Sequence, residues 1–184
     1  MSTVGWIIVG AIAAILILWF IATQNGLVKR DEFCNNALKQ INVQQISRYD
    51  ALQALVKLTR EYSSYEGETL QKIIEARKVT SSPAPTAADI NANESALKEI
   101  GTRLLAVAEA YPELKASANY QSTMRDVKSY EENVRLSRMT YNDTITSYNR
   151  QVRSFPTSIV ASMLGFAKRD YLADDVTKKD FPSF

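Results

Sequence analysis

Hydrophobic residues form one unbroken run near the start of the chain, over residues 4–22. The run reads VGWIIVGAIAAILILWFIA, and no charged residue occurs anywhere in residues 1–28. A helix of these nineteen residues would measure roughly 28 Å, close to the hydrocarbon thickness of a bilayer. Trp6, Trp19 and Phe20 lie near its ends, where aromatic rings favour the membrane interface. The pattern therefore predicts a transmembrane helix over residues 4–22, with these three rings as its anchors.

A cleaved signal peptide is the alternative interpretation of this run. Signal peptides have a shorter apolar core, a positive charge before it and a small-residue cleavage site after it. No basic residue precedes this run, and residues 21–26 form a poor cleavage site. Residues 31–33, which precede Cys34, do not form a lipoprotein cleavage box either. These features favour an uncleaved anchor.

Basic residues lie on one side of the predicted span only. Lys29, Arg30 and Lys39 follow it, and no lysine or arginine precedes it. The positive-inside rule then predicts a single-pass protein of the cell membrane, with residues 1–3 outside and the bulk of the chain in the cytoplasm. The single cysteine, Cys34, is compatible with a reducing compartment.

The rest of the chain has the pattern of long helices separated by a few breaks. Prolines interrupt it at residues 83–85, after Tyr111 and after Phe155, and proline disfavours helix interiors. The predicted helices cover residues 28–79, 87–111, 118–154 and 157–171. We therefore expect a cytoplasmic helical domain over residues 28–171 and an irregular tail over residues 172–184.

Apolar residues in these helices repeat every seven positions, which is typical of helices in left-handed bundles. The third helix has the most regular seam, at Tyr120, Val127, Val134, Tyr141, Tyr148 and Phe155. A shorter seam runs through the second helix, at Leu97, Ile100, Leu104, Val107 and Tyr111. A weaker stripe begins at Leu52 in the first helix. The predicted fold is all-α: a transmembrane helix continuing into an antiparallel, coiled-coil-like bundle of three long helices and one short one.

Four charged residues fall on these apolar stripes: Glu66, Arg77, Glu131 and Arg138. A buried charge costs several kcal/mol, roughly, unless it is paired and hydrogen-bonded. We therefore expect the four residues to form a buried polar network. The network could fix helix register, as polar seam residues do in coiled coils, or it could be a binding site for a partner. A metal or catalytic site is the third reading, but a ferritin-like site needs Glu-x-x-His pairs, and the chain has no histidine.

Two Tyr-Asn pairs, at residues 141–142 and 148–149, are spaced by one heptad. The tyrosines fall on the seam and the asparagines lie beside it. We interpret them as core-edge residues whose phenol and amide groups reach hydrogen-bond partners.

Composition excludes several classes of function. Without histidine, and with one cysteine and six scattered glycines, the chain lacks His-based triads, cysteine zinc sites and glycine-rich phosphate loops. The 22 basic and 20 acidic residues are interspersed, unlike the clustered basic excess of a nucleic-acid binder. We expect no cofactor, no metal, no small-molecule substrate and no enzymatic activity. A hydrolase would require Glu66, Glu109 or Glu131 to converge in a cleft.

Several strings along the chain stand out by their order and spacing. They are SRYDALQALV at residues 47–56, EAYPELKA at residues 109–116, Glu131 with Arg138, the two Tyr-Asn pairs and the Phe-Pro pair at residues 155–156. Together with the N-terminal anchor, they resemble the LemA family of bacterial membrane proteins. The resemblance runs from the anchor to about Tyr171. It implies one N-terminal span with the N-terminus outside and a cytoplasmic helical bundle, and it supplies no catalytic residues.

This chain differs from the family pattern at one place. Family members often have a Pro-Asn pair where Gln53 and Ala54 stand, and these two residues are better helix formers. A straight first body helix, running almost unbroken from the anchor, is therefore expected.

The leading functional hypothesis is a membrane-anchored, non-enzymatic scaffold that self-associates at the inner face of the bacterial cytoplasmic membrane. Bodies held in one membrane plane have a high effective concentration, so modest contacts between them suffice. The alternative is a monomeric adaptor that holds a partner such as a membrane protease or sensor. Both hypotheses include the lipid bilayer as a partner. The scaffold adds further copies of the chain, and the adaptor adds a membrane protein.

Overall fold

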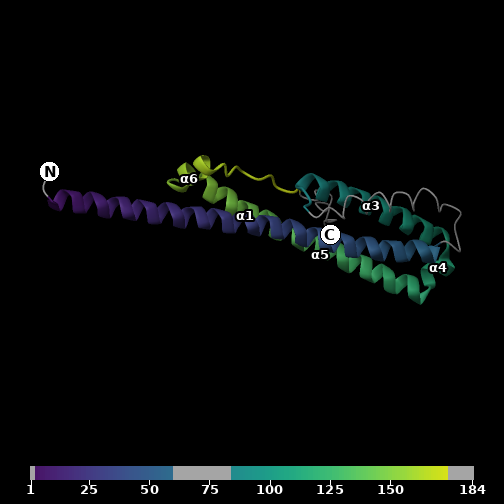
Figure 1. The fold of residues 1–184 in the computed structure, drawn as a ribbon. Coiled ribbons are helices and arrows are strands. Elements are labelled where there is room, and N and C mark those ends of the chain that lie inside the picture. Colours follow the sequence, from purple (N-terminus) through teal and green to yellow (C-terminus); the bar gives the residue numbers. More distant parts are fainter. Residues whose placement is uncertain (1–2, 60–83, 174–184) are drawn as a thin grey trace, which may run out of the picture. The chain divides into compact units, whose positions relative to one another are not determined.

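The computed structural model describes residues 3–59 and 84–173, and every regular element within these ranges is a helix (Figure 1). The helices are α1 (Thr3–Thr59), α3 (Ala87–Ala110), α4 (Pro112–Ala116), α5 (Ala118–Arg153) and α6 (Thr157–Leu164). The predicted all-α class is confirmed. Residues 60–79 of the predicted helix over residues 28–79 lie outside the described residues.

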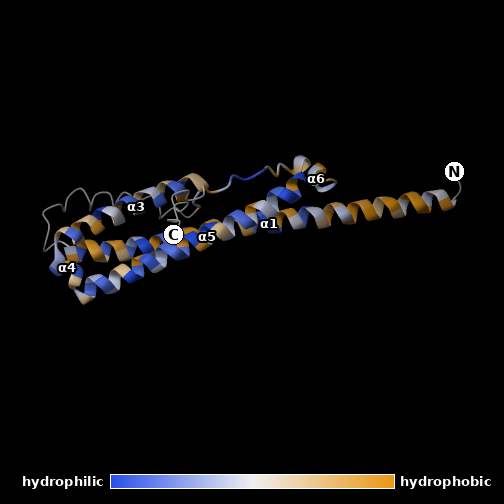
Figure 2. Ribbon diagram, turned by 180° about the vertical axis from the view of Figure 1, so that it is seen from behind, coloured by the Kyte–Doolittle hydropathy of each residue, from blue (hydrophilic) through white to orange (hydrophobic). Residues whose placement is uncertain are grey.

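Helix α1 contains the predicted membrane span. Thr3–Thr59 is one helix of 57 residues, without a break at Gly26 or at Gln53 and Ala54. Among the described helices, α1 is the one long and apolar enough to cross a membrane, and its most apolar window is not buried at all. The hydrophobic colouring of its first part is visible in Figure 2. Trp6 and Trp19 are exposed and Phe20 is half-buried.

The contacts divide the chain into two compact units. Unit 1 consists of Met1–Asn36 and Asn142–Asp170, and unit 2 consists of Ala37–Tyr141 and Tyr171–Phe184. The first part of α1, the end of α5 and all of α6 therefore belong to unit 1. The later part of α1, α3, α4 and most of α5 belong to unit 2.

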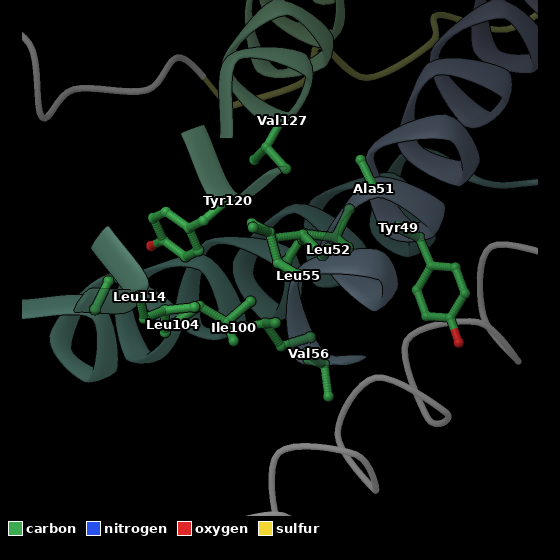
Figure 3. Packing of buried hydrophobic residues seen from close by; sticks show 12 residues of the cluster. Tyr49, Ala51, Leu52, Leu55, Val56, Ile100, Leu104, Leu114, Tyr120 and Val127 are labelled. Atoms are coloured by element: carbon green, nitrogen blue, oxygen red, sulfur yellow. The ribbon is translucent and has the colours of Figure 1, made fainter. Parts of the chain in front are cut away.

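Unit 2 is built around a hydrophobic core shared by its helices (Figure 3). The core includes Leu52, Leu55 and Val56 of α1, together with Leu97, Ile100, Leu104, Ala108, Leu114, Tyr120 and Val127. These residues come from α1, α3, α4 and α5, so four helices enclose one core. Most seam positions predicted for the second and third helices are buried, which supports the bundle prediction.

Local sequence signals explain where the helices begin and end. Thr86 caps α3 through a capping box, in which its hydroxyl accepts from the Asp89 N–H and the Asp89 carboxylate accepts from the Thr86 N–H. Helix α4 was not predicted; it begins at Pro112, a residue that is well suited to the first helical position. Helix α6 ends at Leu164, short of the predicted residue 171, because Gly165 takes a left-handed conformation with φ of 77°.

The end of the third seam also differs from the prediction. Helix α5 ends at Arg153, and Phe155 beyond it is 82% exposed. The prediction that Phe155 closes the buried seam is therefore wrong. Phe155 continues the seven-residue spacing, but it lies beyond the end of α5 and therefore does not belong to the buried face of that helix.

Candidate functional site

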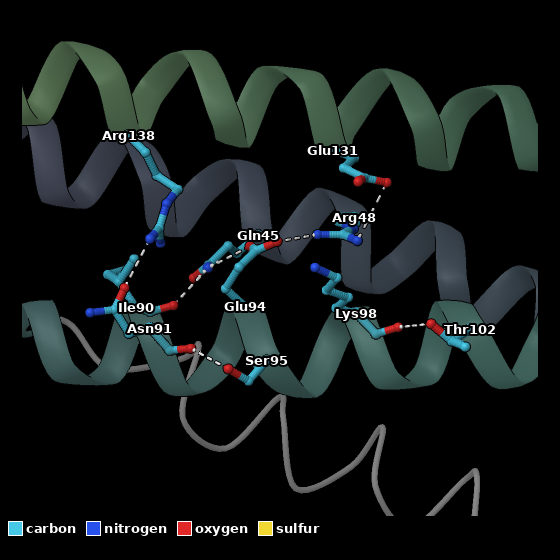
Figure 4. A network of polar contacts seen from close by, with 10 residues as sticks. All are labelled: Gln45, Arg48, Ile90, Asn91, Glu94, Ser95, Lys98, Thr102, Glu131 and Arg138. Atoms are coloured by element: carbon cyan, nitrogen blue, oxygen red, sulfur yellow. Dashed lines mark hydrogen bonds and ion pairs between the residues drawn. The ribbon is translucent and has the colours of Figure 1, made fainter. Parts of the chain in front are cut away.

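Unit 2 contains a polar cluster in which Arg48 of α1 joins side chains from two other helices (Figure 4). Arg48 Nη1 lies 2.7 Å from Glu94 Oε1 of α3, and Arg48 Nη2 lies 3.6 Å from Glu131 Oε2 of α5. Gln45 Nε2 donates to the Ile90 carbonyl at 3.0 Å and to Glu94 Oε2 at 3.3 Å. We call Gln45, Arg48, Glu94 and Glu131 the Arg48 cluster. It connects α1, α3 and α5.

Burial is uneven within the Arg48 cluster. The Arg48 side chain is 3% exposed, Glu94 is 19% exposed and Glu131 is 51% exposed. The close pair with Glu94 is therefore the one that compensates the burial of the guanidinium, whereas solvent screens most of the Glu131 contribution. The helical spacing explains the arrangement, because Gln45, Arg48 and Leu52 follow one another at three and four residues and all lie on the buried face of α1.

Glu131 and Arg138, predicted as members of one network, have separate partners. Arg138 Nη2 donates to Asn91 Oδ1 of α3 at 3.0 Å and to the Ala173 carbonyl at 2.6 Å. Its partners are thus neutral groups, and one of them belongs to the segment that follows α6. Glu66 and Arg77 lie outside the described residues.

Unit 1 contains a second polar cluster around Arg169, which follows α6 in a non-helical segment. Arg169 Nε lies 2.9 Å from Asp31 Oδ1, and Arg169 Nη1 donates to Asn35 Oδ1 at 2.8 Å. The Arg169 N–H donates to Asn149 Oδ1, and Asn149 Nδ2 donates to the Arg169 carbonyl, both at 2.9 Å. We call Asp31, Asn35, Tyr148, Asn149 and Arg169 the Arg169 cluster. It attaches the non-helical segment to α1 and α5.

Tyr148 completes this cluster through its hydroxyl and its ring. The hydroxyl donates to the Ala167 carbonyl at 3.0 Å, and the Arg169 guanidinium lies 5.8 Å from the ring centroid. Burial raises the pKa of Tyr148, the Asp31 charge raises it further, and the Arg169 charge opposes both. The prediction that a Tyr-Asn pair reaches hydrogen-bond partners at the core edge is confirmed for Tyr148 and Asn149.

Cys34 lies beside the Arg169 cluster and is fully buried. Burial raises the pKa of its thiol, and the nearby Arg169 charge lowers it in part. A buried thiol with a raised pKa is a poor nucleophile, because the thiolate is the reactive form.

Both clusters have the composition of structural contacts. Each joins an arginine to a carboxylate and to amide groups, and in the described part of the chain no three His, Cys, Asp or Glu residues gather as metal ligands. The sequence prediction missed Arg48, Glu94, Asp31 and Arg169. The spacing of Arg48 from Leu52 was a usable signal, whereas Arg169 lies in a segment without any periodicity.

Comparison with known proteins identifies the relatives of this chain. It is 27% identical to Protein LemA of Metamycoplasma hominis over 145 residues, which are 79% of this chain and 66% of that protein. It is also 28% identical over 72 residues to the magnetosome proteins MamQ 1 and MamQ 2 of Paramagnetospirillum magneticum, covering 39% of this chain and 26% of each of them. The chain thus spans less than two thirds of the length of these relatives.

The match to a family is broader than the match to any of these proteins. The model of the LemA family matches residues 37–183, which include all of the described part of unit 2 and the end of unit 1. With the long apolar segment of α1, this match indicates a membrane-anchored protein. The chain belongs to the LemA family.

Proposed function

We propose that this protein is a membrane-anchored, non-enzymatic scaffold that self-associates at the inner face of the cytoplasmic membrane. The observation that carries the proposal is a set of exposed apolar residues on two different helices of unit 2. Leu136 and Met139 of α5 are 58% and 52% exposed, and Val43 and Ile46 of α1 are 52% and 37% exposed. We call these the α5 pair and the α1 pair.

The two pairs lie on the outer faces of their helices. The members of each pair are three residues apart, so they are neighbours on the helix surface. Within α5, Val134 and Tyr141 are buried, and within α1, Ile41 and Gln45 are buried. Each pair therefore faces away from the core that its own helix helps to form.

Two distinct apolar strips fit a head-to-tail contact between copies. In such a contact the α1 pair of one copy packs against the α5 pair of the next, and the chain of contacts continues until it closes or forms a filament. Each strip is small, but anchoring confines all copies to one plane and raises their effective concentration. Lys29, Arg30 and Lys39, which follow the apolar segment, support a cytoplasmic location for unit 2.

The non-enzymatic part of the proposal is supported by the use of the polar residues. In both clusters the arginine side chain contacts side chains of a helix to which the arginine does not belong. Their arrangement holds segments of the chain together. It does not present a nucleophile beside a base, which is the arrangement that acyl-transfer and hydrolytic sites need.

Complementary variants test the head-to-tail contact. The first variant is Val43→Glu with Ile46→Glu, and the second is Leu136→Glu with Met139→Glu. Each variant retains one intact strip, so neither should assemble alone, but a mixture should form a discrete heterodimer. The measurement is cross-linking of two differently tagged full-length proteins in one membrane. Asn119→Glu with Ser122→Glu is the matched control, because it adds the same charge with the same spacing at exposed positions of α5 that are about four turns away from the α5 pair.

The outcomes separate the proposals. A cross-linked heterodimer formed by the mixture, but by neither variant alone, supports the scaffold. Assembly lost in both variants and not restored by mixing points to a symmetric contact and contradicts the head-to-tail arrangement. A wild-type protein that remains monomeric contradicts self-association and favours the monomeric adaptor.

A further inference from the structure

Helix α6 and the turn before it expose an apolar surface in unit 1. Phe155 is 82% exposed, Ile159 52%, Met163 72% and Leu164 39%. Val160 and Ala161 are buried, and Leu164, four residues after Val160, lies at the edge of the buried face and is the least exposed of the four. Residues 154–167 contain no charged side chain. We call Phe155, Ile159, Met163 and Leu164 the α6 patch.

The contacts inside unit 1 place the α6 patch along α1. A Cβ on Gly26 would lie 3.4 Å from Gln151 Nε2, and one turn further along α1, Arg30 hydrogen-bonds to Ser147. From the first contact to the second, the residue number rises by four in α1 and falls by four in α5. The end of α5 therefore runs antiparallel to α1, and the numbers of residues at the same level add to 177. By the same register, Arg153 at the end of α5 is level with Gln24, two residues after the apolar run.

Helix α6 begins at that level and lies beside α1 (Figure 1). The chain after α6 returns along α1, because Arg169 contacts Asp31 and Asn35. The α6 patch therefore lies near the level at which the apolar run of α1 ends. In a membrane-spanning α1, this is the depth at which the hydrocarbon region ends and the headgroups begin.

Basic residues surround the same level. Residues 23–32 and 150–170 contain six basic residues and three acidic ones, which leaves an excess of three positive charges. Lys29, Arg30, Arg150, Arg153 and Lys168 are exposed, whereas Asp31 is paired with Arg169. An apolar patch with an exposed basic rim is the pattern by which helices bind the surface of anionic membranes.

We propose that the α6 patch is a second membrane contact, which inserts into the interface of an anionic bilayer beside the anchor. The apolar side chains would lie at the boundary of headgroups and acyl chains, and the basic rim would contact lipid phosphates. Lipid is the expected occupant because the patch is level with the end of the apolar run of α1 within the same unit. The proposal rests on membrane anchoring and does not require self-association.

Spin labels on the full-length protein test the insertion. Cys34→Ala provides the background, because Cys34 is the one cysteine of the chain. Single cysteines then replace Phe155 or Met163, and Asp143→Cys, an exposed position of α5, is the control. The protein is reconstituted at low density in vesicles of phosphatidylcholine with about one quarter phosphatidylglycerol. Collision rates with oxygen, which partitions into lipid, and with a water-soluble nickel chelate are measured by electron paramagnetic resonance.

The proposal predicts that the nickel chelate reaches the labels at 155 and 163 about an order of magnitude less often than the label at 143, while oxygen reaches them more often. In vesicles of phosphatidylcholine alone, both labels should lie closer to water, because the basic rim loses its anionic partner. Equal nickel accessibility at 143, 155 and 163 would overturn the proposal. An unchanged depth without the anionic lipid would overturn the role of the basic rim.

A second copy could also cover the patch, and protein density distinguishes this occupant from lipid. Protection from nickel that disappears on dilution of the protein in the bilayer would show that another copy covers the patch, which contradicts the proposal. Protection that persists at low density supports the lipid contact even if the scaffold hypothesis fails.

Discussion

Both polar clusters are centred on an arginine, but the two arginines connect different kinds of structure. Arg48 is carried by a helix, is 3% exposed and joins α1 to α3 and α5. Arg169 is carried by a non-helical segment, is 27% exposed and joins that segment to α1 and α5. The first arginine lies on the buried face of a helix that packing already positions. The second positions a segment that has no helical structure of its own over residues 166–170.

The difference shows how the free energy of each cluster depends on burial. A fully buried guanidinium has lost its water, so its carboxylate partner compensates a large desolvation penalty. A partly exposed guanidinium keeps some of its water. Its contribution to stability depends on the number and geometry of its hydrogen bonds. Removal of Arg48 should therefore affect the whole of unit 2, whereas removal of Arg169 should release one segment.

The largest expected effect is that of Arg48→Ala. The substitution leaves Glu94 without its close cation in a site that is 19% exposed, so unit 2 should lose about 3 kcal/mol of unfolding free energy. The measurement is denaturant unfolding of the full-length protein in mild detergent, followed by circular dichroism.

The double variant Arg48→Met with Glu94→Leu is the control for this prediction. It removes both charges and keeps side-chain volume, so most of the lost stability should return. A loss below about half a kcal/mol for Arg48→Ala would show that the pair does not compensate a buried charge.

Arg169→Ala is expected to have a smaller and local effect, of about 2 kcal/mol, because it removes charge-assisted hydrogen bonds to Asp31 and Asn35. Hydrogen exchange should accelerate in residues 165–170 and remain unchanged in α3. Arg169→Lys is the matched variant, since it keeps the charge but loses the forked geometry. Faster exchange throughout unit 2 would contradict the local role of Arg169.

Arg138→Ala sharpens the comparison, because the partners of Arg138 are the neutral Asn91 amide and Ala173 carbonyl. The sequence alone would give a loss of about 3 kcal/mol if a glutamate were the buried partner. With neutral acceptors we expect about 1.5 kcal/mol, measured by the same unfolding experiment. A loss as large as that of Arg48→Ala would show that Arg138 has a carboxylate partner in solution.

The smallest effect concerns pH and the Arg169 cluster. The pKa of Tyr148 is raised by burial above its ordinary value of about 10, so the unfolded chain loses this proton at lower pH than the folded chain does. The contribution of the protonated Tyr148 hydroxyl to the free energy of unfolding is therefore complete below about pH 10. It is lost as the pH rises towards the pKa of Tyr148 in the folded protein. Tyr148→Phe should flatten this part of the stability curve. Equal pH dependence in the two proteins would contradict the raised pKa.

Much of the fold was predictable because helices in bundles repeat their packing. The seam residues Tyr120, Val127, Val134 and Tyr141 are all buried, as the heptad count predicted. The same count failed at Phe155 and at the end of α6, where Pro156 and Gly165 end the regular geometry. The heptad spacing therefore predicts which residues are buried only within the bounds of a helix.

The polar clusters were less predictable, for two different physical reasons. Arg48 lies on the buried face of α1, but a long polar side chain gives no hydrophobic signal there. Arg169 occupies a non-helical segment, and its partners Asp31 and Asn149 are distant in sequence. The Tyr148 and Asn149 prediction succeeded because it required only that both side chains reach partners at the core edge. The partners themselves, Ala167 and Arg169, lie outside α5 and were not predicted.

The most direct test of the central claim is a count of protein copies per complex for the full-length chain. The protein is labelled with one fluorophore, extracted with its own lipids into polymer discs and counted by photobleaching steps. The scaffold predicts complexes of more than two copies, and the count should fall to one copy in the Val43→Glu, Ile46→Glu variant. A wild-type protein with a single copy in nearly every disc would contradict self-association in the membrane plane.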